Sequence, residues 1–333
     1  MSTIYLETGS CDPFYNLAFE EYVLTHRREG EYLILWQNDN TIVIGQNQNA
    51  EAEINRSFVE AHDIRVVRRM TGGGAVYHDL GNLNYSFITD AGDAAELTME
   101  VFTRPVVEAL QALELTAEAS GRNDILVNGK KVSGTAQRMT GGRILHHGTL
   151  LFDSDPDMVA GALHVDPEKF RSKSAKSVRS RICNIRPQLK RDLTLEEFWG
   201  YLKTALAKDG FVPGQLSHEE LAEVMELKRR KYDTWEWNFG RSPKFDLTNK
   251  RRFSGGTLEA GFRVEGGTIA EAAFFGDFLS LTSLEPLTQA LVGCPFRQED
   301  VRTVLSRFSL AELFGDIREE EILETIFHAG DLG

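Results

Sequence analysis

The segment Arg68–Asp79 reads RRMTGGGAVYHD and is the most informative stretch of this sequence. Three successive glycines, Gly72–Gly74, let the backbone approach a ligand closely, and their exposed N–H groups are able to hold anionic oxygens. Arg69 carries a planar guanidinium, which binds a phosphate or a carboxylate through paired hydrogen bonds. The alternative is a tight hairpin turn beside a surface ion pair. The polar residues around the glycines favour an anion-binding turn.

Apolar, β-branched runs on both sides of this turn predict strands. Ile64–Arg68 precedes the glycines, and Ala75–His78 and Asn82–Ile88 follow them. The other elements predicted in this part are a helix from the Asp12-Pro13 cap to about Arg27, a hairpin of Tyr32–Trp36 and Thr41–Ile44, strands at Ile125–Val127, Lys131–Arg138 and Ile144–Phe152, and helices at Thr98–Glu114, Leu195–Lys208 and His218–Tyr232.

The end of the chain has a pattern of its own. The loop Asn238–Pro243 is the best candidate for a domain boundary. After it, Leu258–Val264 and Thr268–Phe275 predict a small meander with glycine turns, followed by helices. We therefore expect an α+β protein of two domains, residues 1–242 and residues 243–333.

Composition limits the class of protein. The chain has 333 residues and a formal net charge of −13. A surface this acidic is unsuited to coating nucleic acid or an anionic membrane. Neither a secretory leader nor a run of eighteen apolar residues is apparent, so we expect a cytoplasmic protein, and we expect it to be a monomer. Three scattered cysteines argue against a disulfide framework or a thiolate zinc site.

A basic segment stands out against this acidic background. Residues 169–191 hold nine Lys or Arg and no acidic residue, interleaved with serines. Concentrated cations repel one another unless an anion binds among them. A solvated basic linker is the alternative, but the composition suits a loop that closes on a nucleotide.

The segment Asn123–Ala136 is the third candidate. In a strand, alternate side chains share a face, so Lys131, Ser133 and Thr135 should point together. Lys131 would then be a fixed cation beside two hydroxyls, and Asp124 a weak candidate ligand for Mg²⁺. Sequence signatures of P-loop, Rossmann, zincin and α/β-hydrolase enzymes do not occur.

Several of these segments, in this order, resemble the motifs of lipoate–protein ligases. They are RRMTGGGAVYHDLGN (68–82), KVSGTA (131–136), HHGTLL (146–151) and SVRSRICN (177–184), and the similarity extends over nearly the whole chain. Thr71 stands where the family commonly has serine, and Tyr77 where it commonly has phenylalanine.

The resemblance implies a biotin/lipoate-ligase-type fold, in which a mixed sheet with surrounding helices precedes a small α+β C-terminal domain. It also implies a two-step reaction with free lipoate, ATP and Mg²⁺. Lipoate first becomes lipoyl-AMP with release of pyrophosphate. The lipoyl group then passes to a lysine of a lipoyl domain, such as that of a 2-oxoacid dehydrogenase E2 subunit or the glycine-cleavage H protein.

The same resemblance assigns the site. Lys131 is the catalytic candidate and would contact both ATP and lipoate, because charge accumulating near the ATP α-phosphate needs a fixed cation. The implied ATP contacts are Arg69, Gly74, Ala75, Val76 and Tyr77, and the weaker candidates are Thr71, His78, His147, Ser177 and Arg179.

Three other functions remain open at this point. An acyl-carrier-dependent octanoyl or lipoyl transferase would use a cysteine acyl-enzyme, but none of Cys11, Cys183 and Cys294 lies in a matching motif. A biotin ligase has a different glycine-rich signature. A catalytically silent relative is disfavoured because Lys131 and the whole glycine-rich segment are present.

Overall fold

The computed structural model describes residues 3–92, 98–163, 181–207, 210–240, 245 and 247–327, and for residues 51 and 52 the backbone alone. Two of the weaker candidates, Ser177 and Arg179, and most of the basic segment 169–191 lie outside the described residues. None of the described helices has the length and the apolar run needed to cross a bilayer.

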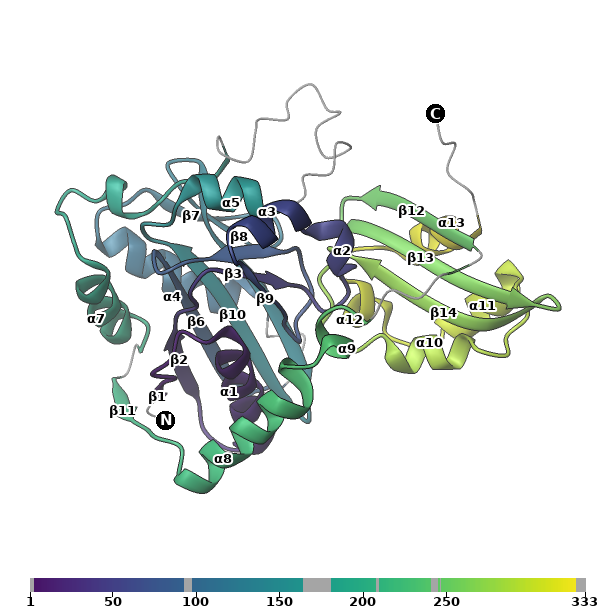
Figure 1. Ribbon diagram of the computed structural model, residues 1–333, viewed down its shortest axis with the longest axis horizontal. Helices are drawn as coiled ribbons and strands as arrows, with labels where there is room; N and C mark the ends of the chain where they lie inside the picture. Colours follow the sequence, from purple (N-terminus) through teal and green to yellow (C-terminus); the bar gives the residue numbers. More distant parts are fainter. Residues whose placement is uncertain are drawn as a thin grey trace.

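An eight-stranded sheet forms the centre of the larger part of the chain (Figure 1). The strands β11, β1 and β2 run parallel to one another, and the remaining neighbours pair antiparallel. Their order across the sheet is β11 (Phe211–Pro213), β1 (Thr3–Glu7), β2 (Tyr32–Trp36), β6 (Asn82–Asp90), β10 (Arg143–Leu151), β9 (Lys130–Thr140), β8 (Asp124–Val127) and β7 (Ala117–Ser120).

One face of this sheet packs against α1 (Pro13–His26), which lies beside α8 (His218–Leu227). The Asp12 side chain caps α1 by accepting the Phe14 N–H, and Pro13 occupies the first turn, as the sequence predicted. Leu17 of α1 packs with Ile34 of β2 in a common apolar core. This helix thereby brings its inner face to the middle of the sheet.

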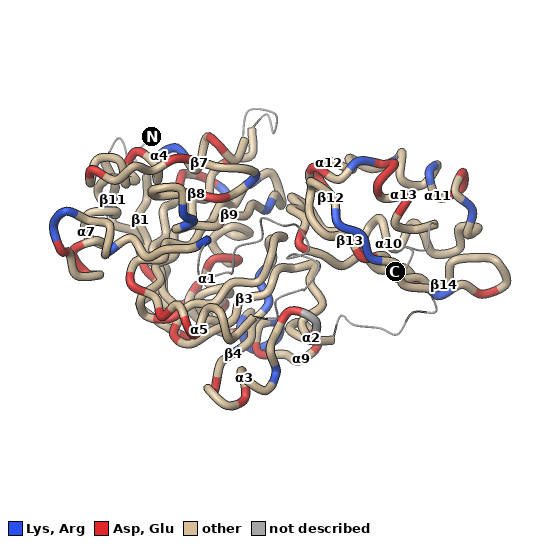
Figure 2. Tube along the Cα trace, turned by 90° about the horizontal axis from the view of Figure 1, so that it is seen from above, with Lys and Arg blue, Asp and Glu red and all other residues tan. Residues whose placement is uncertain are grey.

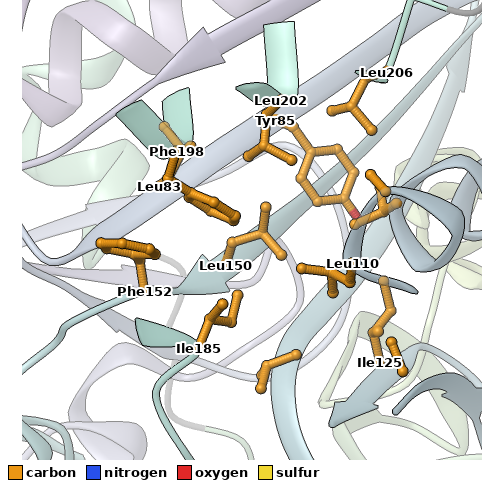
Figure 3. Packing of buried hydrophobic residues seen from close by; sticks show 14 of the residues in the cluster. Leu83, Tyr85, Leu110, Ile125, Leu150, Phe152, Ile185, Phe198, Leu202 and Leu206 are labelled. Carbon is orange, nitrogen blue, oxygen red and sulfur yellow. The ribbon is translucent and has the colours of Figure 1, made fainter. Parts of the chain in front are cut away.

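The other face is covered by α4 (Met99–Ala112) and α7 (Leu195–Ala205). Side chains alternate along β2, so Leu33 joins this second core while Ile34 joins the first. Figure 3 shows Tyr85 and Leu150 of the sheet packed among Leu110 of α4 and Leu202 of α7. The sheet is therefore buried on both faces between helices.

A small three-stranded sheet lies beside the large one and carries the glycine-rich turn. Its order is β4 (Arg65–Arg68), β3 (Thr41–Ile44) and β5 (Val76–His78), and the turn connects β4 to β5. Its core residues pack with those of the short helices α2 (Ala50–Glu53), α3 (Arg56–Ala61) and α5 (Pro156–Ala162). The sheet thus holds both ends of the predicted anion-binding turn.

The predicted hairpin of Tyr32–Trp36 and Thr41–Ile44 is wrong. These segments are β2 and β3, which belong to different sheets, and β3 pairs parallel with β4. The link between them contains Asn38, which is fully buried and bonded to Asn16 and His78. Those side-chain bonds fix the link in a crossover, which strand propensity alone does not reveal.

The C-terminal part forms an apolar core of its own around Phe262, Phe274 and Phe314. A three-stranded antiparallel sheet and four helices contribute to it (Figure 1). They are β12 (Leu247–Phe253), β13 (Gly256–Glu265), β14 (Thr268–Gly276), α10 (Glu285–Leu291), α11 (Gln298–Leu305), α12 (Leu310–Phe314) and α13 (Glu319–Phe327).

Charged residues are distributed over both parts of the molecule (Figure 2). A basic run, Lys250–Arg252, marks β12. Within this run Arg251 pairs with Glu324 of α13 at 2.8 Å, so the charge is partly compensated inside the C-terminal part.

Candidate active site

A cavity beside the glycine-rich turn gathers most of the residues that the motifs indicate. Its walls come from α1, from β2, β6, β9 and β10 of the large sheet, and from β3 and β5 of the small one. The apolar lining is Leu17, Trp36, Val43, Ala75, Val76 and Ala136, and the polar side chains are Arg69, His78, Asn84, Asn123, Lys131, Thr135, His147 and Thr149. Such a mixture suits a ligand with an apolar body and a charged end.

Glycine is required both within the glycine-rich turn and at Gly45, the residue that faces it. Gly73 has a φ of +86°, a left-handed conformation that side chains disfavour. At Gly45, which faces this turn, a Cβ atom would lie 2.1 Å from the Gly73 carbonyl oxygen. Gly74 and Ala75 line the cavity next to it. The turn is therefore held close against the end of β3.

Arg69 braces the turn from inside. Its guanidinium donates to the carbonyl oxygens of Val43, Gly72 and Gly74 at 3.1, 2.7 and 2.8 Å, and to Thr71 Oγ1 at 2.9 Å. Only 6% of the residue is exposed. Burial lowers the pKa of Arg69 to about 10, and the nearby Glu20 carboxylate opposes this shift. The predicted ATP ligand is thus also the structural support of the turn.

Thr71 and His147 continue this network toward α1. Thr71 Oγ1 lies 2.8 Å from His147 Nε2, and His147 Nδ1 lies 2.9 Å from Glu20 Oε1. Glu20 Oε1 also accepts the Ser86 hydroxyl at 2.6 Å, and Ser86 accepts the Trp36 indole N–H. Both weaker candidates, Thr71 and His147, therefore belong to one buried hydrogen-bond chain.

His78 presents a donor to the cavity that it lines. Asn16 donates to Asn38 Oδ1, so the Asn38 amide nitrogen must face His78 Nδ1, which lies 3.1 Å away. Burial, with the positive charge of Arg69, lowers the pKa of His78 to about 3, so the ring is neutral and carries its hydrogen on Nε2. Among the described residues that nitrogen has no partner. The ring therefore offers an N–H to a ligand.

Lys131 lines the cavity from β9. Its Nζ is 2.7 Å from Asp124 Oδ1, and both side chains are 35% exposed. A Cβ atom at Gly134 would approach Lys131 Nζ to 3.1 Å, so the glycine leaves room for the lysine along the strand. The two residues predicted to act on the nucleotide and the metal are thus in direct contact.

The predicted common face of Lys131, Ser133 and Thr135 is wrong, because an extra residue in β9, Val132, separates Lys131 from the alternation that Ser133 and Thr135 keep. The pairing of β8 with β9 shifts register between Ile125 and Leu126, which interrupts the simple alternation of β9. Lys131 and Thr135 line the cavity, whereas Ser133 is fully buried and does not line it.

The remaining candidates divide into two groups. Gly74, Ala75 and Val76 line the cavity. The Tyr77 side chain instead packs in the core of the small sheet, and its hydroxyl donates to Asn40. In the described part of the chain, no cluster of three or more His, Cys, Asp or Glu residues is arranged to hold a metal.

The C-terminal part contacts the glycine-rich turn directly. The Phe278 carbonyl accepts the Gly73 N–H at 3.0 Å, and Asn47 donates to Ser280 Oγ at 2.9 Å. A Cβ atom at Gly72 would lie 2.7 Å from the Ser280 nitrogen. The Gly73 amide, which the sequence analysis assigned to an anion, therefore has a carbonyl partner in this structure.

None of the three cysteines has the environment of a nucleophile. Burial raises the pKa of Cys11, Cys183 and Cys294, which disfavours the thiolate. Cys183 is close to Lys131 in the backbone, because its N–H donates to the Lys131 carbonyl at 3.0 Å. Among the described residues its thiol contacts only the Val127 and Lys130 carbonyls and no base, so the cysteine acyl-enzyme loses support.

Sequence reasoning missed Glu20, Trp36 and Asn84, which line the cavity or hold residues that do. For Glu20 a signal existed. It lies three residues after Leu17 and four before Leu24, on the buried side of α1, and a charge on an apolar helix face needs a partner.

Family comparisons agree with this geometry. The family model described as "Lipoyl protein ligase A/B catalytic domain" matches residues 12–207, and "Bacterial lipoate protein ligase C-terminus" matches residues 242–326. "Lipoate-protein ligase LplJ" of Bacillus subtilis (strain 168) is 43% identical over 322 residues, which cover 95% of this chain and 97% of the relative. The chain belongs to the lipoate–protein ligase family.

Solved structures extend the comparison of this ligase. P. falciparum LipL1 in complex with lipoate has a TM-score of 0.77 at 24% identity, and the match covers 92% of this chain and 95% of that one. A bi-partite lipoate protein ligase from Thermoplasma acidophilum, solved as part of a lipoylation system with an E2 lipoyl domain, has a TM-score of 0.63 at 32% identity, with 74% and 98% covered. A lipoate-protein ligase A bound with ATP has a TM-score of 0.62 at 28% identity, with 72% and 98% covered.

These findings confirm the family and the fold class expected from the motifs. They also confirm the class of enzyme, an ATP-dependent lipoate–protein ligase.

Proposed function

We propose that this ligase attaches lipoate to a lysine of lipoyl domains in two steps that use MgATP. In the first step, a lipoate carboxylate oxygen attacks the α-phosphorus of ATP. The bond to the β-phosphate breaks, pyrophosphate leaves and lipoyl-AMP forms. The position of Lys131 at a cavity with an apolar wall carries this proposal.

Lys131 is the proposed catalytic residue. Attack of a carboxylate on ATP brings like charges together, so a cation fixed at the reacting centre stabilises the transition state. The Lys131 ammonium is held by Asp124, which limits its freedom before the substrates bind.

The apolar wall suits the other end of lipoate. Leu17, Trp36 and Val43 face the cavity, and each is nearly fully buried. They offer the acyl chain and dithiolane ring an apolar environment. Arg69 and the backbone of residues 74–77 are the proposed ATP contacts, with Thr71, His78 and His147 as further pocket contacts.

Mg²⁺ fits this site through Asp124. Magnesium is commonly held by one or two carboxylates together with substrate phosphates, and Asp124 supplies such a carboxylate beside Lys131. When bound, the ion would neutralise phosphate charge. The chain's own residues, Lys131 above all, then hold the carboxylate and the α-phosphate in place.

In the second step, the neutral amine of the acceptor lysine attacks the carbonyl of lipoyl-AMP. An amide bond forms and AMP leaves. The proposed acceptors are lipoyl domains of 2-oxoacid dehydrogenase E2 subunits and the glycine-cleavage H protein. The T. acidophilum ligase, whose solved lipoylation system includes its own E2 lipoyl domain, supports this choice.

We also propose a division of the chain into two domains. Residues 1–242 are the proposed ligase domain, and residues 243–333 an accessory domain with its own core. Ser177 and Arg179, outside the described residues, are proposed contacts of the adenylate. A monomer in the cytoplasm is the proposed working state.

Transfer to an acceptor tests the function. The full chain is incubated with lipoate, MgATP and an apo lipoyl domain, and the acceptor is weighed by mass spectrometry. One lipoyl group should be added, and none when the acceptor lysine is replaced by arginine. An unmodified acceptor under saturating substrates would contradict the proposal.

A further inference from the structure

Among the described residues, Glu20 is the only Asp or Glu that is almost fully buried, with 2% of its surface exposed. It lies on α1, far in sequence from the glycine-rich turn. A buried charge is costly unless it is paired and hydrogen-bonded. Its partners therefore indicate what this charge does in the molecule.

The direction of each hydrogen bond in its network follows from chemistry. Trp36 only donates, so Ser86 accepts from it and gives its own proton to Glu20. A carboxylate only accepts, and His147 Nδ1 lies 2.9 and 3.1 Å from its two oxygens. His147 Nδ1 must therefore carry a hydrogen.

The other end of the network is compatible with this assignment. Arg69 Nε only donates, and it donates to Thr71 Oγ1 at 2.9 Å. The Thr71 hydroxyl proton is then able to point at His147 Nε2, which lies 2.8 Å away. Both ends thus fit a His147 ring with its hydrogen on Nδ1.

We propose that Glu20 is a positioning residue of this ligase, which acts through His147 and Thr71 on Arg69. Its carboxylate selects the Nδ1–H form of His147, and this form orients the Thr71 hydroxyl that receives the Arg69 Nε–H. Arg69 in turn holds the carbonyl groups of Gly72 and Gly74. Glu20 is also the negative charge that balances the buried Arg69 cation.

The consequence for catalysis rests on the proposed function. A turn whose shape is fixed before the nucleotide binds does not have to be ordered at that moment, which favours binding. Loss of the Glu20 carboxylate should therefore weaken the apparent affinity for ATP more than the maximal rate of adenylate formation.

The histidine tautomer is measured in the ligand-free full chain. Nitrogen-15 NMR of labelled histidines distinguishes Nδ1–H from Nε2–H, and a His147→Gln variant assigns the His147 signal. We expect Nδ1–H in the wild type. Glu20→Gln keeps an acceptor oxygen and should keep this tautomer, whereas Glu20→Met removes the acceptor and should move the hydrogen to Nε2.

Lipoate-dependent ATP–pyrophosphate exchange gives the second readout. For Glu20→Met we expect the KM for ATP to rise about tenfold, with kcat changed by less than about threefold, and Glu20→Gln should recover most of the KM. The matched control is Glu21→Gln, because Glu21 bonds to Tyr232 and Lys231 outside this network. It should leave the KM for ATP and the His147 tautomer at their wild-type values.

Two results would overturn the proposal. One is an Nε2–H or doubly protonated His147 in the wild type at neutral pH. This measurement uses the wild type alone, so it does not depend on whether a variant folds. The other is folded Glu20→Met with the hydrogen still on Nδ1. An absence of exchange in the wild type would instead contradict the proposed function, and the tautomer measurement would still decide the role of Glu20.

Discussion

His146, the neighbour of His147, shows at the scale of one residue how the two faces of β10 differ. It is fully buried, stacks on Phe102 at 5.0 Å and has no hydrogen-bond partner for either ring nitrogen among the described residues. Burial lowers its pKa to about 3. An imidazole of this kind is neutral in the folded protein and protonates only on unfolding.

This predicts a pH dependence of stability. Because the folded pKa lies below that of an unfolded histidine, the unfolded chain binds more protons between about pH 3 and pH 6.5, and stability falls as the pH is lowered through this window. In His146→Phe, the loss of unfolding free energy between pH 7 and pH 5 should be about 2 kcal/mol smaller than in the wild type. Urea unfolding at both pH values measures it, and an unchanged pH dependence would contradict this view of His146.

At the scale of elements, the close approach of β3 to the glycine-rich turn is the critical contact. Gly45→Ala would place a methyl group 2.1 Å from the Gly73 carbonyl, so backbone must move. We expect ATP–pyrophosphate exchange to fall by at least about tenfold, because a misplaced binding group commonly costs that much or more.

Gly200→Ala is the matched control for this substitution. Gly200 lies within α7, and a Cβ atom there would meet nothing within 4 Å. Alanine at such a helical position should raise stability by about 0.5–1 kcal/mol, and exchange should stay at the wild-type level. Wild-type exchange in Gly45→Ala would show that the turn tolerates displacement.

The elements also show what sequence could and could not predict. The α1 cap, the strands around the glycines and the cavity positions of Gly74, Lys131 and His147 follow from local patterns and motifs. The predicted hairpin of β2 and β3 was wrong because buried hydrogen bonds of Asn38 fix the path of the segment between these strands. The predicted common face of Lys131 with Ser133 and Thr135 was wrong because a register shift depends on the partner strand, which period-two patterning does not specify.

On the scale of the whole molecule, the two parts have separate cores. Phe198 belongs to the core beneath the eight-stranded sheet and Phe314 to the C-terminal core, and both are fully buried. Contacts such as Gly73 with Phe278 join the two parts at the glycine-rich turn. The family motifs indicated this division, but the side-by-side placement of the parts at the turn could not be predicted from local sequence.

Separate cores predict separate responses to cavity-forming substitutions. Phe314→Ala should destabilise by about 3–5 kcal/mol and increase amide hydrogen exchange mainly within residues 247–327. Phe198→Ala, the same change in the other core, should act mainly on the eight-stranded sheet and its helices. Hydrogen exchange read by mass spectrometry separates the two, and equal acceleration throughout the chain in both variants would contradict a division near residue 243.

In the proposed reaction, the cavity of this ligase forms an adenylate with Lys131 as its fixed cation. Lipoate-dependent ATP–pyrophosphate exchange, measured without any acceptor protein, tests it most directly. The wild type should exchange, and Lys131→Met should lose at least about a hundredfold in rate, the usual effect of removing one such stabilising group. Undiminished exchange in Lys131→Met would contradict the catalytic role of Lys131. A wild type that shows no exchange yet transfers acyl groups from an acyl-carrier protein would contradict adenylate formation.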